Sequence, residues 1–158
     1  MLESLAGGHP YIIKFDKTFE DTTKNILYLV MELVEGGNLE SRLKNKEEAN
    51  TLNEDEAVHY FLQMVTVVLY LTEHKIVHRD LKPANFLLRE KSIVLIDFGL
   101  SKESAESMIE MRTSVGTNPY MAPELFDENN VYDEKVDVYA LAVILFEMLE
   151  GSLPNVKA

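Results

Sequence analysis

The sequence has no cysteine and no tryptophan among its 158 residues, and it is poor in cations, with 15 Lys and Arg residues against 27 Asp and Glu residues. Without cysteine, disulfide bonds and thiolate metal sites are excluded. The net charge of -12 argues against nucleic acid as a partner, because phosphate backbones are bound mainly through Lys and Arg. A negative surface favours basic peptides instead.

The sequence also lacks a long hydrophobic run. The longest, residues 139–146, is too short to span a bilayer, and the first residues show no secretory signal pattern. We therefore expect no membrane partner and an intracellular, cytoplasmic protein. The length suffices for one domain with a sizeable hydrophobic core.

Three short motifs lie in the second half of the sequence. They are His-Arg-Asp at 78–80 with a lysine at 82 and an asparagine at 85, Asp-Phe-Gly at 97–99, and Ala-Pro-Glu at 122–124. Each is weak alone, since Asp-Phe-Gly is more often a turn and His-Arg-Asp is more often a solvated charge cluster. In this order and spacing, however, they supply a base, a cation and two metal-binding side chains, which are the groups that phosphoryl transfer needs.

Two apolar runs separate the first motif from the second. Residues 86–88 and 93–96 each predict a short strand, and the polar residues between them predict a turn. Such a hairpin brings Asn85 close to Asp97. Because Mg²⁺ prefers oxygen ligands and takes only one or two of them from protein, Asn85 and Asp97 are candidate Mg²⁺ ligands.

The three motifs resemble those of the eukaryotic protein kinase family, serine/threonine type. The resemblance implies that Asp80 is the catalytic base for a substrate hydroxyl and that Asn85 and Asp97 hold Mg²⁺. Lys82 then contacts the phosphoryl group transferred from ATP. Thr117, in the Gly-Thr pair, together with Lys82 implies Ser or Thr hydroxyls of proteins as acceptors. The alternative for Lys82 is an ordinary surface lysine.

The polar stretch of residues 100–121 is long for a loop, which predicts either a functional or a disordered segment. The resemblance makes it an activation segment, in which Thr113 or its neighbour Ser114 carries an activating phosphate. Such a phosphate could pair with Arg79 through charge-assisted hydrogen bonds. An unmodified, solvated Thr113 is the open alternative.

Residues 11–19 and 26–34 predict two strands joined by a charged turn. The second resembles the strand that leads into the kinase hinge. This resemblance implies a nucleotide site with Met31 as gatekeeper, backbone groups of Glu32 and Val34 on the adenine edge, Asn38 near the ribose and Leu87 beneath the ring. In almost any other fold, Met31 and Leu87 would simply be core residues.

Two helices are expected. A capping box with Thr51 as N-cap predicts the start of the first, and its apolar face is expected at Val58, Phe61, Leu62, Val65, Val68 and Leu69. The second, residues 137–149, is apolar on nearly every side and is expected in the middle of the domain. The resemblance gives structural roles to His78, Phe98, Gly99, Glu124 and Asp137, with Asp137 bonding the backbone of the catalytic loop.

The Gly-rich loop, the strand Lys and the helix Glu that the resemblance implies are not seen before residue 11, and the family's later helices are not seen before residue 158. We therefore expect an α+β, partial kinase-like fold, with the end of an N-lobe and the hinge at 1–34 and a truncated C-lobe at 35–158. Two functions remain open, an ATP-dependent serine/threonine kinase region and a catalytically inactive binding module.

Overall fold

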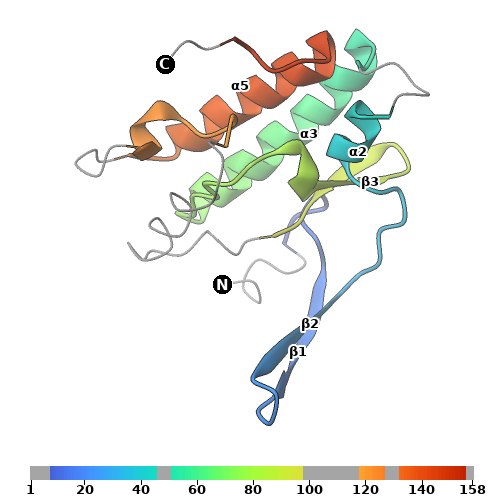
Figure 1. The fold of residues 1–158 in the computed structure, drawn as a ribbon, viewed down its shortest axis with the longest axis vertical. Coiled ribbons are helices and arrows are strands. Elements are labelled where there is room, and N and C mark those ends of the chain that lie inside the picture. Colours follow the sequence, from blue (N-terminus) through green and yellow to red (C-terminus); the bar gives the residue numbers. More distant parts are fainter. Residues whose placement is uncertain (1–7, 46–50, 98–117, 127–131, 156–158) are drawn as a thin grey trace.

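The computed structural model describes residues 8–45, 51–97, 118–126 and 132–155. In chain order the elements are β1 (Phe15–Asp21), β2 (Ile26–Met31), α2 (Leu39–Leu43), α3 (Glu54–Glu73), the 3₁₀ turn η1 (Pro83–Asn85), β3 (Phe86–Arg89), β4 (Ser92–Leu95), the 3₁₀ turn η2 (Pro123–Phe126) and α5 (Lys135–Glu150). The strands pair only as antiparallel hairpins and the helices lie between and after them, so the predicted α+β class is confirmed (Figure 1).

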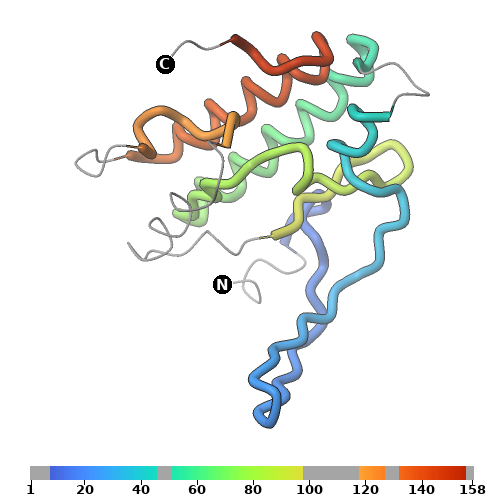
Figure 2. The backbone as a smooth tube through the Cα atoms, in the orientation of Figure 1, coloured from blue at the N-terminus to red at the C-terminus, as the bar shows by residue number. Residues whose placement is uncertain are grey.

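The strands form two separate antiparallel hairpins. β1 pairs with β2, with an irregularity between Phe15 and Lys17, and β3 pairs with β4 from Phe86 opposite Leu95 to Arg89 opposite Ser92. The β3–β4 hairpin was predicted from its two apolar runs and is confirmed. The β1–β2 hairpin projects away from the helices, as the backbone trace in Figure 2 shows.

Residues 11–13 were expected to belong to the first hairpin, but they lie beside β4 instead. The backbone N–H of Ile13 donates to the carbonyl oxygen of Leu95 at 3.0 Å, and Leu95 N–H donates to the carbonyl oxygen of Tyr11 at 2.8 Å. Ile12 is consequently buried in the core. The physical reason is burial, because the apolar pair Ile12 and Ile13 is better covered next to β4 than in the exposed hairpin.

The hydrophobic core lies where α3, α5 and β4 meet. α3 and α5 run side by side in Figure 1, and β4 packs against α3. The fully buried side chains in this core include Met64 and Leu71 of α3, Ile144 and Met148 of α5, and Ile93 and Leu95 of β4. The loop of residues 74–82, which follows α3 and carries the His-Arg-Asp motif, therefore starts from a well-packed helix.

The buried face of α3 differs from the predicted one. Of the six residues expected there, only Val68 is buried, and Val58, Leu62 and Leu69 are exposed at 44%, 58% and 57%. The core is met instead by Ala57, Tyr60, Gln63, Met64, Val67, Val68 and Leu71. Both sets have helical spacing, and only the tertiary neighbours decide between them.

The start of α3 also differs from the prediction. Asn53, not Thr51, is the N-cap, and its side-chain oxygen accepts a hydrogen bond from Glu56 N–H at 2.9 Å. A carboxamide is at least as good a cap as a threonine hydroxyl. The acidic residues of the first turn are then well placed for the helix dipole.

Besides the outer face of α3, apolar side chains are exposed on β2, where Leu27 is 62% exposed, and on α5, where Val138 and Phe146 are 55% and 41% exposed. The helix at 137–149 was expected in the middle of the domain, and α5 is buried on one face, with Ile144 and Met148 at 0% exposure, but not on every face. No helix in the described part of the chain is both long and apolar enough to cross a membrane.

Candidate active site

The loop that carries the His-Arg-Asp motif is tied to α5 by Asp137. One carboxylate oxygen of Asp137 accepts from the backbone N–H of His78 at 2.7 Å, and the other accepts from that of Arg79 at 2.8 Å. Asp137 is only 1% exposed. Burial raises the pKa of Asp137, and these hydrogen bonds and the charges of His78 and Arg79 oppose that rise.

Arg79 takes a left-handed backbone conformation, with a φ of 71°. A residue with a side chain is strained there, so its neighbours must hold it in place. The bond to Asp137 is one such restraint, and the guanidinium lies 5.2 Å from the centre of the Tyr132 ring. The loop geometry is therefore imposed by tertiary contacts.

Asp80 lies at the centre of a hydrogen-bond network. Its Oδ2 is 2.6 Å from Nζ of Lys82 and 3.3 Å from Nδ2 of Asn85. Its Oδ1 accepts from Nδ2 of Asn118 at 3.0 Å, and its backbone oxygen accepts from Nδ2 of Asn85 at 2.8 Å. Two side chains of the same loop, Lys82 and Asn85, and Asn118 from a distant turn thus fix a carboxylate that is 10% exposed.

His78 supports this network from beneath. It is 1% exposed, and its Nδ1 accepts from the backbone N–H of Asp80 at 3.3 Å. Burial lowers the pKa of His78, although the carboxylates of Asp137, Asp80 and Asp97 act in the opposite direction. A neutral imidazole that accepts a backbone bond fits the structural role expected for His78.

The β3–β4 hairpin brings residues 85 and 96 together. Ile96 N–H donates to the backbone oxygen of Asn85 at 2.9 Å, so Asp97 follows directly at the strand end. Asp97 is exposed and left-handed, with a φ of 64°. Both hydrogen bonds of the Asn85 amide nitrogen go to Asp80, which leaves the Asn85 amide oxygen as the group able to meet a cation.

The described residues contain no group of three or more His, Cys, Asp or Glu side chains that could hold a metal ion. Asn85 and Asp97 offer two oxygen ligands, one from an amide and one from a carboxylate. They fit the requirements of Mg²⁺, which commonly takes one or two protein oxygens and completes its shell with water and phosphate.

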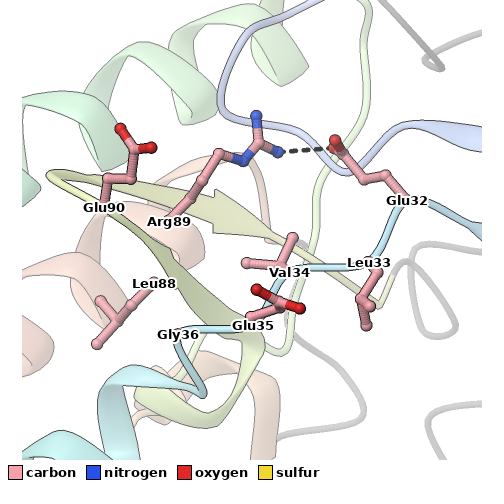
Figure 3. A pocket seen from close by; sticks show the side chains of 8 residues that line it. All are labelled: Glu32, Leu33, Val34, Glu35, Gly36, Leu88, Arg89 and Glu90. Carbon is pink, nitrogen blue, oxygen red and sulfur yellow. Dashed lines mark hydrogen bonds and ion pairs between the residues drawn. The ribbon is translucent and has the colours of Figure 1, made fainter.

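A pocket of about 410 Å³ lies between residues 32–36, at the predicted hinge, and residues 88–90. Figure 3 shows Arg89 reaching across it to Glu32, where Nη2 and Oε1 are 2.7 Å apart. The hinge backbone passes close to β3 here, since a Cβ added to Gly36 would lie 2.1 Å from the Leu88 oxygen. Only glycine permits this approach.

The predicted nucleotide residues fall around this hinge, but they do not all line the pocket. Glu32 and Val34 do, whereas Met31 ends β2 at 44% exposure. Leu87 and Asn38 lie together, joined by an isolated β-bridge. The Asn38 side chain also caps α2, accepting from Ser41 N–H at 2.8 Å.

Several backbone N–H and C=O groups of residues 32–34 are available to bind a ligand. Glu32 N–H donates to the Lys14 oxygen at 2.9 Å. With the other described residues, the Glu32 carbonyl oxygen and both backbone groups of Val34 make no hydrogen bond. These are the groups that the resemblance assigns to the adenine edge.

Five of the predicted site residues, Phe98, Gly99, Thr113, Ser114 and Thr117, lie outside the described residues. Glu124 is half-buried in η2. Asn118 was not predicted, although it contacts Asp80 directly. An asparagine two residues before Tyr120 is a local turn signal, but nothing in that signal indicates a partner 38 residues away.

Comparison with known proteins identifies the family of the chain. The family model described as "Protein kinase domain" matches residues 1–157. Myosin light chain kinase A of Dictyostelium discoideum is 39% identical over 151 residues, which are 93% of this chain and 49% of that protein. A provisionally named serine/threonine-protein kinase A of Trypanosoma brucei brucei is 38% identical over 152 residues, 93% of this chain and 35% of that protein.

The chain thus spans about half of the first relative and about a third of the second. The family match covers nearly the whole chain, including the catalytic loop, the hinge and α5. The chain belongs to the protein kinase domain family.

Proposed function

We propose that this chain is the catalytic region of an ATP-dependent protein serine/threonine kinase. The observation that most strongly supports this proposal is the position of the Asp80 carboxylate. Lys82, Asn85 and Asn118 hold it, on a loop that is anchored to the buried Asp137. A base fixed at a surface loop, beside a lysine and two metal-binding groups, is suited to accept a hydroxyl proton during phosphoryl transfer.

Each residue has a role in this proposal. Asp80 accepts the proton of the substrate hydroxyl, and Lys82 stabilises charge on the transferred phosphoryl group. Asn85 and Asp97 would hold Mg²⁺, which neutralises charge on the phosphates of ATP. The backbone of Glu32 and Val34 binds adenine beside Met31, with Leu87 beneath the ring and Asn38 near the ribose.

The proposed substrates are Ser and Thr hydroxyls of proteins, which Thr117 would help to select. The net charge of -12 favours basic sequences around them. Phosphate on Thr113 or Ser114 would pair with Arg79 and order the activation segment. An intracellular, cytoplasmic setting, where ATP is available, fits this activity.

The test follows ³²P transfer from ATP to a basic Ser peptide, to its Tyr counterpart and to the chain itself. We expect transfer to the Ser peptide that Asp80→Asn and Asp97→Ala reduce by about 100-fold or more, whereas the surface variant Asp133→Asn has wild-type activity. A folded wild-type chain that transfers no phosphate would refute autonomous catalysis.

One observation favours the alternative, a catalytically inactive binding module. The apolar side chains of β2, including Leu27, Leu29 and Met31, are 62%, 45% and 44% exposed near the hinge. A partner protein that packs on this apolar surface needs no catalytic chemistry. Transfer that depends on Asp97 would rule out this alternative, and a folded, inactive chain that binds ATP weakly or not at all would support it.

A further inference from the structure

The two oxygens of the Asp80 carboxylate are not equivalent. An ionised carboxylate oxygen can accept about two hydrogen bonds. Among the described residues, Oδ2 accepts two, from Lys82 at 2.6 Å and from Asn85 at 3.3 Å. Oδ1 accepts one, from Asn118 at 3.0 Å. Counted over the described residues, Oδ1 therefore has room for one more donor, and Oδ2 has none.

We propose that Oδ1 is the oxygen that receives the substrate proton and that Asn118 is the residue that positions it. This inference rests on the proposed kinase function. In the reaction, the hydroxyl O–H bond breaks and its proton passes to Oδ1. The hydroxyl oxygen bonds to the γ-phosphorus, and ADP leaves with the electron pair of the broken P–O bond. Asn118 touches neither reactant and acts only through Asp80.

The orientation of the Asn118 amide is fixed by its other contacts. Its Oδ1 accepts from Tyr120 N–H at 3.1 Å, and its backbone oxygen accepts from Met121 N–H at 3.1 Å. In the flipped amide, the NH₂ group would face the Tyr120 N–H and the carbonyl oxygen would face the Asp80 carboxylate. Both contacts would be repulsive, so the hydrogen-bond network assigns the NH₂ group to Asp80.

The turn that carries Asn118 is anchored to the same helix as the catalytic loop. The Tyr120 hydroxyl donates to Oε2 of Glu147 at 2.5 Å, and Tyr120 is only 8% exposed. Glu147 belongs to α5, as does Asp137, which holds the loop of Asp80. Both ends of the Asn118–Asp80 contact are therefore fixed by one rigid element, as a positioning contact requires.

The decisive variant is Asn118→Asp. It keeps the size of the side chain and the oxygen that accepts from Tyr120, but it replaces the donor to Asp80 with a second carboxylate. We expect kcat to fall about 10- to 100-fold, part of the contribution of a positioned base, with KM for ATP unchanged. Asn118→Leu, which removes the donor without adding charge, should lower kcat in the same direction.

The matched control is Asn53→Asp. It makes the same chemical change at the N-cap of α3, a residue that has no hydrogen bond to Asp80 or to the partners of Asp80 described above. Aspartate caps a helix as well as asparagine does. We expect wild-type kcat. Urea unfolding of each variant separates loss of fold from loss of positioning.

A double variant distinguishes positioning from a general structural role. If Asn118 acts through Asp80, Asn118→Asp adds no further loss of kcat in the Asp80→Asn background. A further loss of the same size as in the wild type would overturn the inference. So would an unchanged kcat in Asn118→Asp when the wild-type chain transfers phosphate.

Different results would refute the kinase function and the Asn118–Asp80 contact. Absence of transfer by the folded wild-type chain would overturn the proposed function and the role of Oδ1 with it. The contact itself has its own measurement, the side-chain amide signals of Asn118 in ¹⁵N NMR spectra. They should shift in Asp80→Asn while those of Asn53 do not, and unshifted Asn118 signals would refute the contact even in an inactive chain.

Discussion

Replacing Asp137 with asparagine perturbs the anchor of the catalytic loop with the smallest change in shape. In the wild type, the two carboxylate oxygens accept from His78 and Arg79 at 2.7 and 2.8 Å. In Asp137→Asn, one oxygen becomes an NH₂ group that faces an N–H donor. One buried backbone donor then loses its acceptor.

The magnitude follows from burial. An unsatisfied buried N–H group costs about 1–3 kcal/mol. The variant also removes a carboxylate that is costly to ionise, since burial raises the pKa of Asp137, and this relief offsets part of the loss. We expect the free energy of unfolding to fall by about 1–3 kcal/mol, a sizeable part of the ~5–15 kcal/mol typical of a domain. Displacement of the loop by about 1 Å would cost kcat about 100-fold.

Urea unfolding followed by far-ultraviolet circular dichroism measures this change, because the sequence has no tryptophan to serve as a fluorescence probe. Asp133→Asn is the matched control. Asp133 is exposed, accepts from Lys135 N–H at 2.9 Å just before α5 and would be replaced by an equally good acceptor. A loss in Asp137→Asn no larger than in this control would refute the anchoring role.

Two further predictions concern His78 and Gly36. Burial lowers the pKa of His78 below its ordinary value of 6.5, so the unfolded chain binds a proton that the folded chain does not. The neutral, buried His78 therefore does not lower the free energy of unfolding above pH 6.5, and it lowers this free energy progressively as the pH falls below 6.5. The free energy of unfolding should therefore fall more steeply between about pH 7 and pH 5 in the wild type than in His78→Asn, and equal slopes would contradict the prediction. In Gly36→Ala, the new Cβ would lie 2.1 Å from the Leu88 oxygen. The hinge must then shift, and we expect about 1–3 kcal/mol of destabilisation and a higher KM for ATP, whereas unchanged values would show that the hinge yields freely.

Local patterns in the sequence were sufficient to predict the β3–β4 hairpin. The hairpin has two apolar runs, 86–88 and 93–96, around a polar turn. The paired strands, Phe86–Arg89 and Ser92–Leu95, match these runs to within one residue. The bond from Asp137 came from the family resemblance, and the structure places both of its oxygens on the loop backbone. A local sequence pattern predicts the structure correctly where only one arrangement of the chain satisfies it, as for this hairpin.

Patterns failed where several arrangements satisfied them equally. α3 has apolar residues on two faces, and the buried one is decided by contact with α5 and β4, as Met64 and Leu62 show with 0% and 58% exposure. Residues 11–13 have a high β propensity, which does not determine the strand they pair with. They pair with Leu95 because the side chains of Ile12 and Ile13 are buried at that edge of β4. Asn118 depends on a contact over 38 residues that no local signal encodes.

The geometry of the base therefore depends mostly on α5, which lies late in the sequence. The loop of Asp80 has no helix or strand between the end of α3 and η1, and strained Arg79 cannot define its path locally. Asp137 and Glu147 of α5, about 15 Å apart along the helix, hold this loop and the turn of Asn118 respectively. A rigid helix that sets the spacing between the two attachments explains how side chains from distant segments meet at one carboxylate.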